Sequence, residues 1–315
     1  MARLGEFLMK VVSYYNVVPV VNKSQEKFDI LTKFIQGVNA AGDTGIVYSG
    51  YDLQQCDVGV IQGWQHDLGK NMPHLKLRKL VMDRNANTHV CTADANLFLY
   101  ANKSNQPHHY LRYSFNGIFP TTGQYFDNIV DPIRWQQISR DTGIHLEAIK
   151  RYGRNILICA QRHQGWSMGN ISLDKWLLDT CHAIRKYSDR PILIRLHPKD
   201  NASNRRAPQI QQLFKNFKGV ALSRNNSIED DLKNCWAVVN HNSSSIVGPL
   251  IKGYSAFITD PIKSQCAEVA HHNFQDIETP KEFDRQRWLE RISMFHWKFS
   301  ELENGTAWRH IRQYV

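Results

Sequence analysis

The sequence lacks the features of a membrane-spanning or secreted protein. No apolar run reaches the roughly 18 residues that a membrane-spanning helix needs. Residues 1–9 contain one Arg and one Glu and no apolar core typical of a signal peptide. The six cysteines are scattered without a Cys-x-x-Cys pair, which argues against a disulfide scaffold and a zinc site. These absences favour a reduced, cytoplasmic protein.

Several motifs of cofactor-dependent and metal-dependent enzymes are also missing. There is no Gly-x-Gly-x-x-Gly and no phosphate-loop motif, and no Cys-x-x-Cys accompanies a His-x-Glu as in zinc deaminases. The 14 histidines include the adjacent pairs His108-His109 and His271-His272, which do not have the spacing of zinc ligands. We therefore expect neither a bound metal nor a cofactor.

The charge is positive and unevenly distributed. The formal net charge is +10; residues 1–150 carry 15 Lys and Arg against 13 Asp and Glu, and residues 151–315 carry 24 against 16. No run of five or more basic residues occurs, so there is no basic tail. A basic balance favours an anionic partner, such as a nucleic acid or a nucleotide-sugar.

Apolar runs alternate with amphipathic stretches, which predicts two sets of βαβ units. In the first half we expect strands at 10–15, 46–48 and 57–64, with a helix capped by Ser24 whose apolar face is Phe28, Leu31, Ile35 and Val38. Residues 100–135, rich in aromatics, Asn, Gly and Pro, lack periodicity and are predicted to be a long structured loop.

A short helix is predicted over 146–152, and the second set of units begins at residue 155. Its strands are expected near 155–160, 191–195, 219–223, 236–240 and 255–259, with helices between them. The last helix would carry Trp288, Ile292, Phe295 and Phe299 on one face. We thus predict two Rossmann-like domains, residues 1–152 and 153–315, with the C-terminal helix packing back on the first.

Two motifs of the second half follow predicted strands. They are Arg195-Leu-His197-Pro198-Lys199-Asp200 and Asn240-His-Asn242-Ser243-Ser244-Ser245. In open α/β sheets ligands bind at the carboxyl ends of strands. Arg195, His197 and Lys199 offer donors to an anion, and Asn242 and the three serines open a helix whose N–H groups can bond phosphate oxygens. The alternative is a structural Asn and an ordinary Ser N-cap.

A third polar stretch follows the strand at 155–160. Gly165 permits close approach of the backbone, Arg162 could clamp a diphosphate, and Trp166, next to Ser167, could stack on a base or sugar. The alternative is a loop whose Trp fills a gap between domains.

A GT-B glycosyltransferase has two α/β halves that face each other across a cleft, and one of them holds an anion. The predicted organisation of this chain matches that plan. Such an enzyme can neutralise the leaving phosphate with helix N-termini and basic side chains instead of a metal. An inverting transferase also needs a general base for the acceptor hydroxyl. Asp94, before the apolar run 97–100 that we take for a strand, is the candidate, and Asp67 is the rival.

Aromatic and basic residues of the first half could grip an acceptor, because such side chains bind bases and sugars alike. The alternative is a satellite hydrophobic cluster. The residues assigned to the acceptor are Trp64, His66, Tyr110, Arg112, Tyr113, Phe115 and Asn116.

These motifs together resemble phage-encoded glycosyltransferases of the GT-B type that decorate hydroxymethylated pyrimidines in DNA. The motifs are Asp94-Ala-Asn-Leu-Phe-Leu-Tyr100, Arg112-Tyr-Ser-Phe-Asn-Gly117, Gln161-Arg-His-Gln-Gly-Trp-Ser-Met168, Arg195-Leu-His-Pro198 and Asn242-Ser-Ser-Ser245, over roughly residues 50–310. The last two are also similar to motifs of capsule polysaccharide and Kdo transferases.

The resemblance implies a UDP-sugar as donor and a hydroxymethyl group on a DNA base as acceptor, in the cytoplasm of a phage-infected cell. It implies Asp94 as the base, Arg162, Arg195, His197, Ser243 and Ser244 as donor ligands, and Glu268 as a ligand of the donor ribose. A transferase of surface polysaccharide and a non-catalytic nucleic-acid-binding protein on the same fold are the alternatives. The sugar, the stereochemistry and the oligomeric state do not follow from the sequence.

Overall fold

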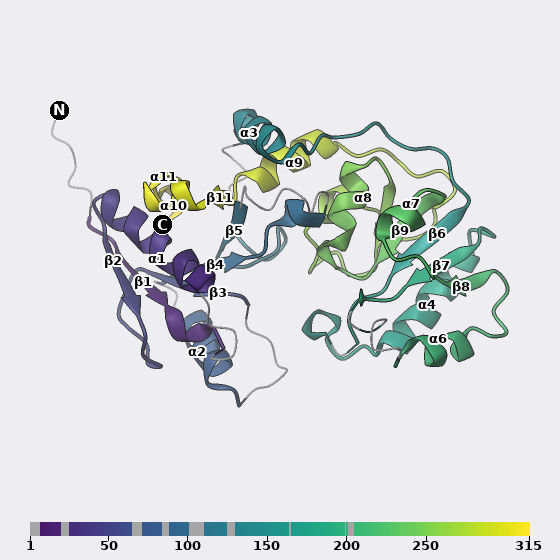
Figure 1. The fold of residues 1–315 in the computed structure, drawn as a ribbon, viewed down its shortest axis with the longest axis horizontal. Coiled ribbons are helices and arrows are strands. Elements are labelled where there is room, and N and C mark those ends of the chain that lie inside the picture. Colours follow the sequence, from purple (N-terminus) through teal and green to yellow (C-terminus); the bar gives the residue numbers. More distant parts are fainter. Residues whose placement is uncertain are drawn as a thin grey trace. The chain divides into compact units, whose positions relative to one another are not determined.

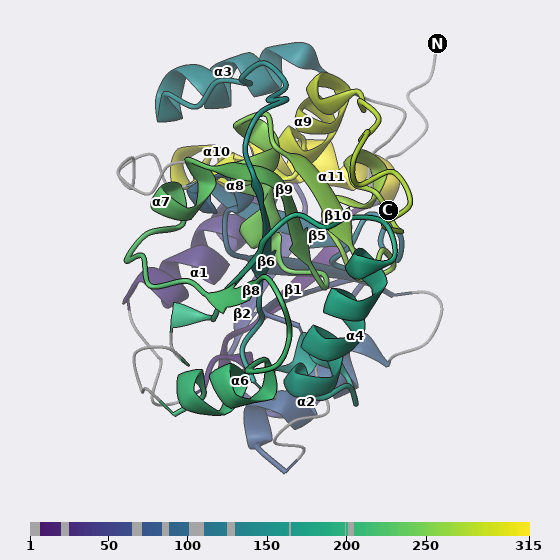
Figure 2. The ribbon, with the colours of Figure 1, turned by 90° about the vertical axis from the view of Figure 1, so that its right-hand side faces the viewer.

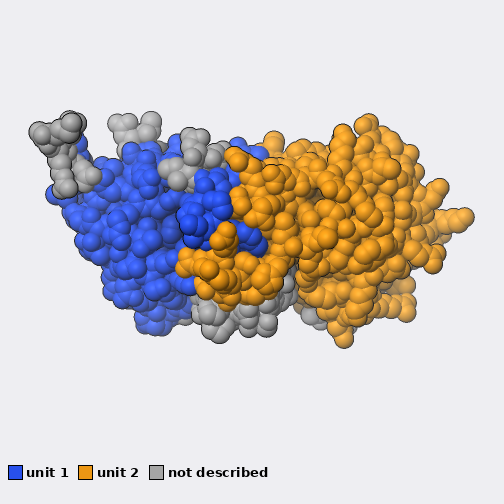
Figure 3. All heavy atoms as spheres, turned by 90° about the horizontal axis from the view of Figure 1, so that it is seen from above, with its two compact units in different colours: residues 1–96, 106–135, 291–315 blue, residues 97–105, 136–290 orange. Residues whose placement is uncertain are grey.

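The computed structural model describes residues 7–19, 25–64, 71–83, 88–100, 110–124, 130–163, 165–198, 200 and 205–315. His66, Asp67 and Lys199, predicted as site residues, lie outside these ranges, as does the capping residue Ser24. The chain divides into two compact units (Figure 3). Unit 1 contains residues 1–96, 106–135 and 291–315, and unit 2 contains residues 97–105 and 136–290.

Unit 1 is built on a mixed six-stranded sheet, in the order β11-β5-β4-β3-β1-β2 (Figure 1). Its strands are β1 (Lys10–Tyr14), β2 (Thr44–Tyr48), β3 (Val58–Gln62), β4 (His89–Asp94), β5 (Tyr110–Phe115) and β11 (His296–Lys298). The pairs among β1 to β4 are parallel, as the βαβ pattern predicts, whereas β5 runs antiparallel to both β4 and β11.

The helices of unit 1 bury the faces that the apolar spacing predicts. In α1 (Gln25–Ala40) the buried residues include Leu31, Ile35 and Val38, and only Phe28 of the predicted face is exposed, at 37%. The other helical segments are η1 (Tyr15–Val17), α2 (Pro73–Met82), α10 (Phe299–Glu303), α11 (Thr306–Ile311) and η8 (Arg312–Tyr314), while α3 (Pro132–Thr142) contains the boundary at which the two units are divided.

The C-terminal segment belongs to unit 1 because a buried carboxylate holds it there. Asp43 Oδ2 accepts hydrogen bonds from Trp308 Nε1 and Arg312 Nε, each at 2.7 Å. Burial raises the pKa of Asp43, but the hydrogen bonds from Arg312, Met9 and Trp308 outweigh it and leave that pKa lowered. The carboxylate therefore stays ionised and holds α11 close to the start of β2.

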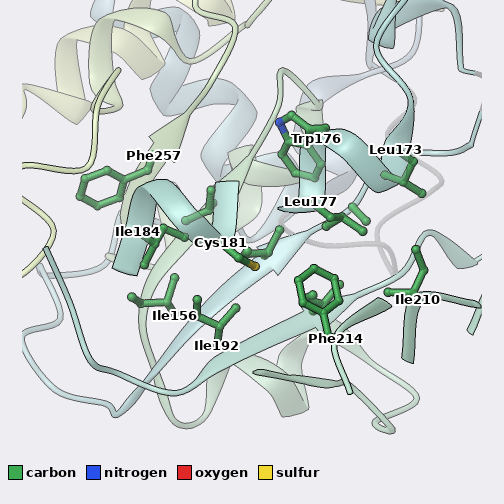
Figure 4. Close-up of a cluster of buried hydrophobic side chains, with 14 of the residues drawn as sticks. Ile156, Leu173, Trp176, Leu177, Cys181, Ile184, Ile192, Ile210, Phe214 and Phe257 are labelled. Carbon is green, nitrogen blue, oxygen red and sulfur yellow. The ribbon is translucent and has the colours of Figure 1, made fainter. Parts of the chain in front are cut away.

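Unit 2 is a parallel five-stranded sheet in the order β10-β9-β6-β7-β8. Its strands are β6 (Asn155–Cys159), β7 (Ile192–Arg195), β8 (Val220–Leu222), β9 (Cys235–Asn240) and β10 (Ser255–Ile258). Figure 2 shows α4 (Leu173–Arg185) and α6 (Ala207–Leu213) on one face of it. Ile156, Leu177, Ile184 and Phe214 belong to the hydrophobic cluster under these helices (Figure 4).

Serine side chains cap two helices of unit 2. Ser172 caps α4 and Ser227 caps α7, each accepting a hydrogen bond from a backbone N–H three residues on. The helical segments of unit 2 besides α4 and α6 are η3 (Leu97–Tyr100), η5 (Trp166–Met168), α7 (Ile228–Leu232), η6 (Ser244–Ile246), α8 (Val247–Ile251) and η7 (Ala267–Val269). Another boundary between the units lies within α9 (Arg285–Ser293). Within the described residues no helix is both long and apolar enough to cross a bilayer.

Four predictions of local structure are wrong, and the first three concern helices. Residues 97–100 form the 3₁₀ helix η3 and not a strand, and 146–152 form no helix. The predicted last helix ends at Ser293, since residues 296–298 pair with β5 as strand β11. Hydrogen bonds to a sheet edge outweigh a helical spacing of apolar residues there. Accordingly 136–152 cluster with unit 2 and 291–315 with unit 1.

The aromatic stretch predicted as a loop is a buried strand. Tyr110, Tyr113 and Phe115 lie on β5 and are at most 1% exposed. The Tyr113 hydroxyl donates to the Ile30 carbonyl at 2.9 Å, and its ring stacks on Phe34 with centroids 5.1 Å apart. Packing in the core of unit 1 leaves these three aromatics no exposed face for an acceptor, so that assignment is wrong.

We expect Phe115→Ala to destabilise the protein by about 3–5 kcal/mol, because it leaves a cavity in the core of unit 1. Ile133→Ala, at a position that is 64% exposed, should cost no more than about 0.5 kcal/mol. Chemical denaturation of the two variants checks this. Equal stabilities would contradict the burial of β5.

His296 makes stability depend on pH. It is fully buried, and burial, with Arg112 and Arg134 adding to it, lowers its pKa from 6.5 to about 3, although the Ile292 carbonyl opposes the shift. The unfolded chain binds a proton near pH 6.5 that the folded chain does not, so stability is full above 6.5 and falls as pH drops toward 3. Between pH 7.5 and pH 5, the wild type should lose about 2 kcal/mol more than His296→Gln in denaturation experiments.

Candidate functional site

The sheet of unit 2 reverses its strand order between β6 and β9. From β6 the chain continues through α4 to β7 on one side, and from β9 it continues through η6 and α8 to β10 on the other. A ligand crevice is expected beyond the carboxyl ends of the two strands at such a switch point. Gln161 lies two residues after β6, and Asn242 lies two residues after β9.

Gln161 and Asn242 hold the two strand ends together. Gln161 Nε2 donates to Asn242 Oδ1 at 2.8 Å, and the Asn242 backbone N–H donates to Gln161 Oε1 at 3.0 Å. Both residues are buried. Because buried amides need partners, this reciprocal pair fixes the orientation of both side chains.

The network extends to the loops on either side of the switch. Gln161 Nε2 also donates to Ser167 Oγ at 2.6 Å, and Asn242 Nδ2 donates to the Ser167 carbonyl and to Asp260 Oδ2, each at 2.9 Å. Asp260 lies two residues after β10. One chain of hydrogen bonds therefore joins the polar residues that follow β6, β9 and β10.

A pocket of about 390 Å³ lies against this network. Residues that follow β6, β9 and β10 line it: Ser167, Met168, Gly169, Asn170, Ile171, His241, Thr259, Asp260, Pro261, Ile262 and Lys263. The volume is in the range of small-ligand sites. Much of the lining is apolar, and the Ser167 hydroxyl and the Lys263 ammonium are groups in it that can bind an anion.

Thr259 ties the wall of the pocket to α4. Its hydroxyl oxygen accepts from Trp176 Nε1 at 2.8 Å and lies 2.7 Å from His241 Nδ1. Burial lowers the pKa of His241, and the nearby Asp260 carboxylate does not reverse this. His241 is thus neutral at pH 7 and meets a ligand as an uncharged donor or acceptor.

The serine-rich motif begins a helical segment, as predicted. Ser243 is its N-cap and its hydroxyl accepts from the Ser245 N–H at 3.2 Å, so the capping interpretation applies to Ser243. Asn240 Nδ2 donates to the Ser243 carbonyl at 2.7 Å, which fixes the turn. Within the described part of the chain the Ser244 N–H has no partner, so it is open to an anion.

The predicted cations differ in their surroundings. Arg162 is exposed and forms no ion pair within the described residues, so its guanidinium can turn toward a ligand. His197 is half-buried two residues after β7. Arg195, in contrast, donates to the carbonyls of Asn225, Asn226 and Ser227 and to Asp231 Oδ2 at 2.7 Å. These bonds give Arg195 a structural role instead of the predicted contact with the donor.

The other predicted donor ligands occupy two places. Gly165 and Trp166 begin η5, next to Ser167. Glu268 is exposed on η7 and does not line the pocket.

Residues 165–169 have the Gly-x-Ser-x-Gly spacing of a hydrolase nucleophile elbow. Ser167 lies in a 3₁₀ helix and accepts from Gln161, whereas an elbow needs a sharp strand-to-helix turn.

In unit 1, Asp94 and Arg112 form an ion pair. They are cross-strand partners on β4 and β5, with Asp94 Oδ2 and Arg112 Nη2 2.5 Å apart. Arg112 is 4% exposed, whereas the Asp94 side chain is 33% exposed and can reach a substrate.

Two other residues predicted to bind the acceptor hold local structure. Trp64 follows β3, and its carbonyl accepts a hydrogen bond from Arg78 Nη1 at 3.2 Å. Asn116 has φ 51° and bonds Val90 and Gln124, so it shapes a turn.

The residues that the sequence analysis missed are Gln161, His241, Thr259, Asp260 and Lys263. The other motifs were found as polar side chains at the end of a predicted strand. The same rule applies to Thr259 and Asp260, at the end of the strand predicted over 255–259. Gln161 is part of a motif already noted, but nothing in the sequence indicates its pairing with a residue 81 positions away.

Asn242→Ala should lower the free energy of unfolding by about 2 kcal/mol, because Gln161 and Asp260 each lose a partner. Asn273→Ala, at an exposed position, should cost well below 1 kcal/mol. In a double-mutant cycle, Gln161→Ala should cost at least about 0.5 kcal/mol less in the Asn242→Ala background than in the wild type. Strict additivity in denaturation curves would refute the pairing.

No protein-family model matches the sequence, and no curated protein is similar to it in sequence. Two solved structures are similar in fold. The beta Kdo 2,7 transferase of KpsC from Thermosulfurimonas dismutans superposes with a TM-score of 0.56 at 12% identity, covering 97% of this chain and 100% of that one. The beta Kdo 2,4 transferase of the same protein has a TM-score of 0.54 at 12% identity, covering 93% of each chain. The chain thus has the two-unit α/β architecture of GT-B glycosyltransferases over nearly its whole length.

Proposed function

We propose that this protein is a glycosyltransferase that moves a sugar from a nucleotide-sugar to a hydroxyl acceptor. The observation that carries the proposal is the pocket at the switch point of unit 2, bounded by the Gln161–Asn242–Asp260 network. The fold adds support, because its structural neighbours include transferases of a sugar. The sequence motifs add the resemblance to enzymes that use UDP-sugars.

The donor diphosphate would lie at the beginning of the segment 244–251. The open Ser244 N–H and the Ser167 and Ser245 hydroxyls can donate to phosphate oxygens, and the exposed Arg162 and Lys263 can neutralise charge. Negative charge grows on the leaving diphosphate as the glycosidic bond breaks, so fixed donors there stabilise the transition state. We propose that these groups suffice without a metal ion.

Asp94 would act as the general base. Its carboxylate is partly exposed, and Arg112 holds one oxygen in place while the Ala95 N–H donates to the other at 2.7 Å. A carboxylate held in this way removes the proton of the acceptor hydroxyl as that oxygen attacks the anomeric carbon. In the wild type, the proton goes to Asp94 and the sugar–phosphate bond breaks.

For the acceptor we propose the hydroxymethyl group of a modified pyrimidine in DNA, on the strength of the motif resemblance. A saccharide acceptor is the second candidate, favoured by two observations. The aromatics expected to grip a base are buried on β5, and the two fold neighbours described above are Kdo transferases.

One experiment separates the acceptors. Hydroxymethylcytosine-containing DNA and a saccharide acceptor are incubated with a panel of UDP-sugars, with and without a chelator, and the products are weighed by mass spectrometry. A gain of one sugar on the nucleoside supports the DNA acceptor, and a gain on the saccharide alone supports the second candidate. Loss of activity with the chelator would contradict metal-independent transfer.

Asp94→Asn should lower the turnover number about 10²–10⁴-fold, because the amide cannot take up the proton. UDP affinity, measured by calorimetry, should not change, since the donor pocket lies in unit 2. Asp83→Asn, an exposed acid at the end of α2, is the matched control and should retain activity. Turnover of Asp94→Asn within threefold of the wild type would exclude Asp94 as the base.

A further inference from the structure

The sheet of unit 1 has a switch point of its own. From β1 the chain continues through α1 to β2 on one side, and from β3 it continues through α2 to β4 on the other. The carboxyl ends of β1 and β3 therefore flank a second position at which a ligand crevice is expected. Val17 follows β1 in η1, and Gly63 and Trp64 follow β3.

The guanidinium of Arg78 is fixed at this position. Arg78 lies on α2, and its Nε donates to the Val17 carbonyl at 3.1 Å while its Nη1 donates to the Trp64 carbonyl at 3.2 Å. Gly63 has φ 73°, and a Cβ there would lie 3.1 Å from Arg78 Nη2. The two carbonyls orient the guanidinium, and Nη2 has no partner in the described part of the chain.

Asp94 and Arg112 adjoin this guanidinium. The Gly63 N–H donates to the Ala93 carbonyl at 2.9 Å, which places the end of β3 beside Asp94. Arg112 carries two buried donors, Nε and Nη1, without a hydrogen-bond partner in the described residues. In the part of the chain that the structure describes, the Arg78 and Arg112 guanidinium groups thus accompany the Asp94 carboxylate, which is paired with Arg112.

Among the described residues Arg78 forms no ion pair, and only the nearby Asp94 carboxylate favours its charged form. Burial lowers the pKa of Arg78 to about 10, while the Asp94 carboxylate opposes this, so the side chain remains protonated at pH 7. A partly desolvated cation without a bonded anion costs free energy. An anionic ligand would offset that cost, and the planar fork of Arg suits the oxygens of a phosphate.

We propose that the unit 1 switch point binds a phosphate of the acceptor strand, with Arg78 as the principal ligand and Arg112 contributing positive charge. The inference rests on the proposed function, which it deepens by assigning the acceptor an anionic group close to the reacting hydroxyl. Phosphate contacts of this kind set the position of a nucleic acid without reading its sequence. Here the contact would position the modified base at Asp94.

The test compares 5-hydroxymethyl-deoxycytidine with its 5′-monophosphate as acceptors. The wild type should have a KM about tenfold lower for the monophosphate, with little change in kcat. Arg78→Gln should remove most of that preference, and Arg78→Lys should keep part of it, because the charge remains while the fork is lost. Lys76→Gln, an exposed change of equal charge on the same helix, should preserve the preference.

Calorimetric binding of the monophosphate without donor separates the two proposals. If no hydroxymethylpyrimidine is glycosylated yet the monophosphate binds in an Arg78-dependent manner, the acceptor is misassigned and the phosphate site stands. If glycosylation occurs but Arg78→Gln weakens nucleoside and monophosphate equally, the phosphate site is refuted and the function stands. Thermal melting checks that each variant is folded. If Arg78→Gln does not fold, the comparison of Arg78→Lys with the wild type tests the phosphate site.

Discussion

The reciprocal amide pair of Gln161 and Asn242 is the interaction on which the candidate donor site depends. It bridges the ends of β6 and β9, the two strands at which the order of the unit 2 sheet reverses. Asn242 then fixes Asp260, and Gln161 fixes Ser167, so loops from three strands take their positions from two buried side chains. Buried amides tolerate few alternative arrangements, which keeps the pocket walls in one geometry.

Both units place their polar groups by the same topological constraint. Parallel strands bring all their carboxyl ends to one edge, and a reversal of strand order opens a crevice there. In unit 2 the Gln161–Asn242 amide pair and the start of the segment 244–251 lie at this edge. In unit 1 the Arg78 guanidinium lies at this edge, with the Asp94–Arg112 pair at the neighbouring strand end.

The two arginines of the sequence motifs show how residue type can mislead. Arg195 stands at a strand end, where a donor ligand is expected, yet loop carbonyls and Asp231 take up its hydrogen bonds. Arg112 is part of an aromatic run that was expected to contact an acceptor, yet on β5 it is buried and forms an ion pair with Asp94. In each case the available partners, which come from distant parts of the chain, decide the role.

The sequence by itself determined the α/β class and most strands, because hydrophobic spacing is a local signal. It also determined which strand ends carry polar groups. Only the tertiary structure decided that Tyr113 and Phe115 belong to a central strand, that 296–298 leave a helix to complete the sheet, and that Asp94 pairs with Arg112. These outcomes depend on strand pairing and buried hydrogen bonds between residues far apart in the chain, and no local pattern encodes them.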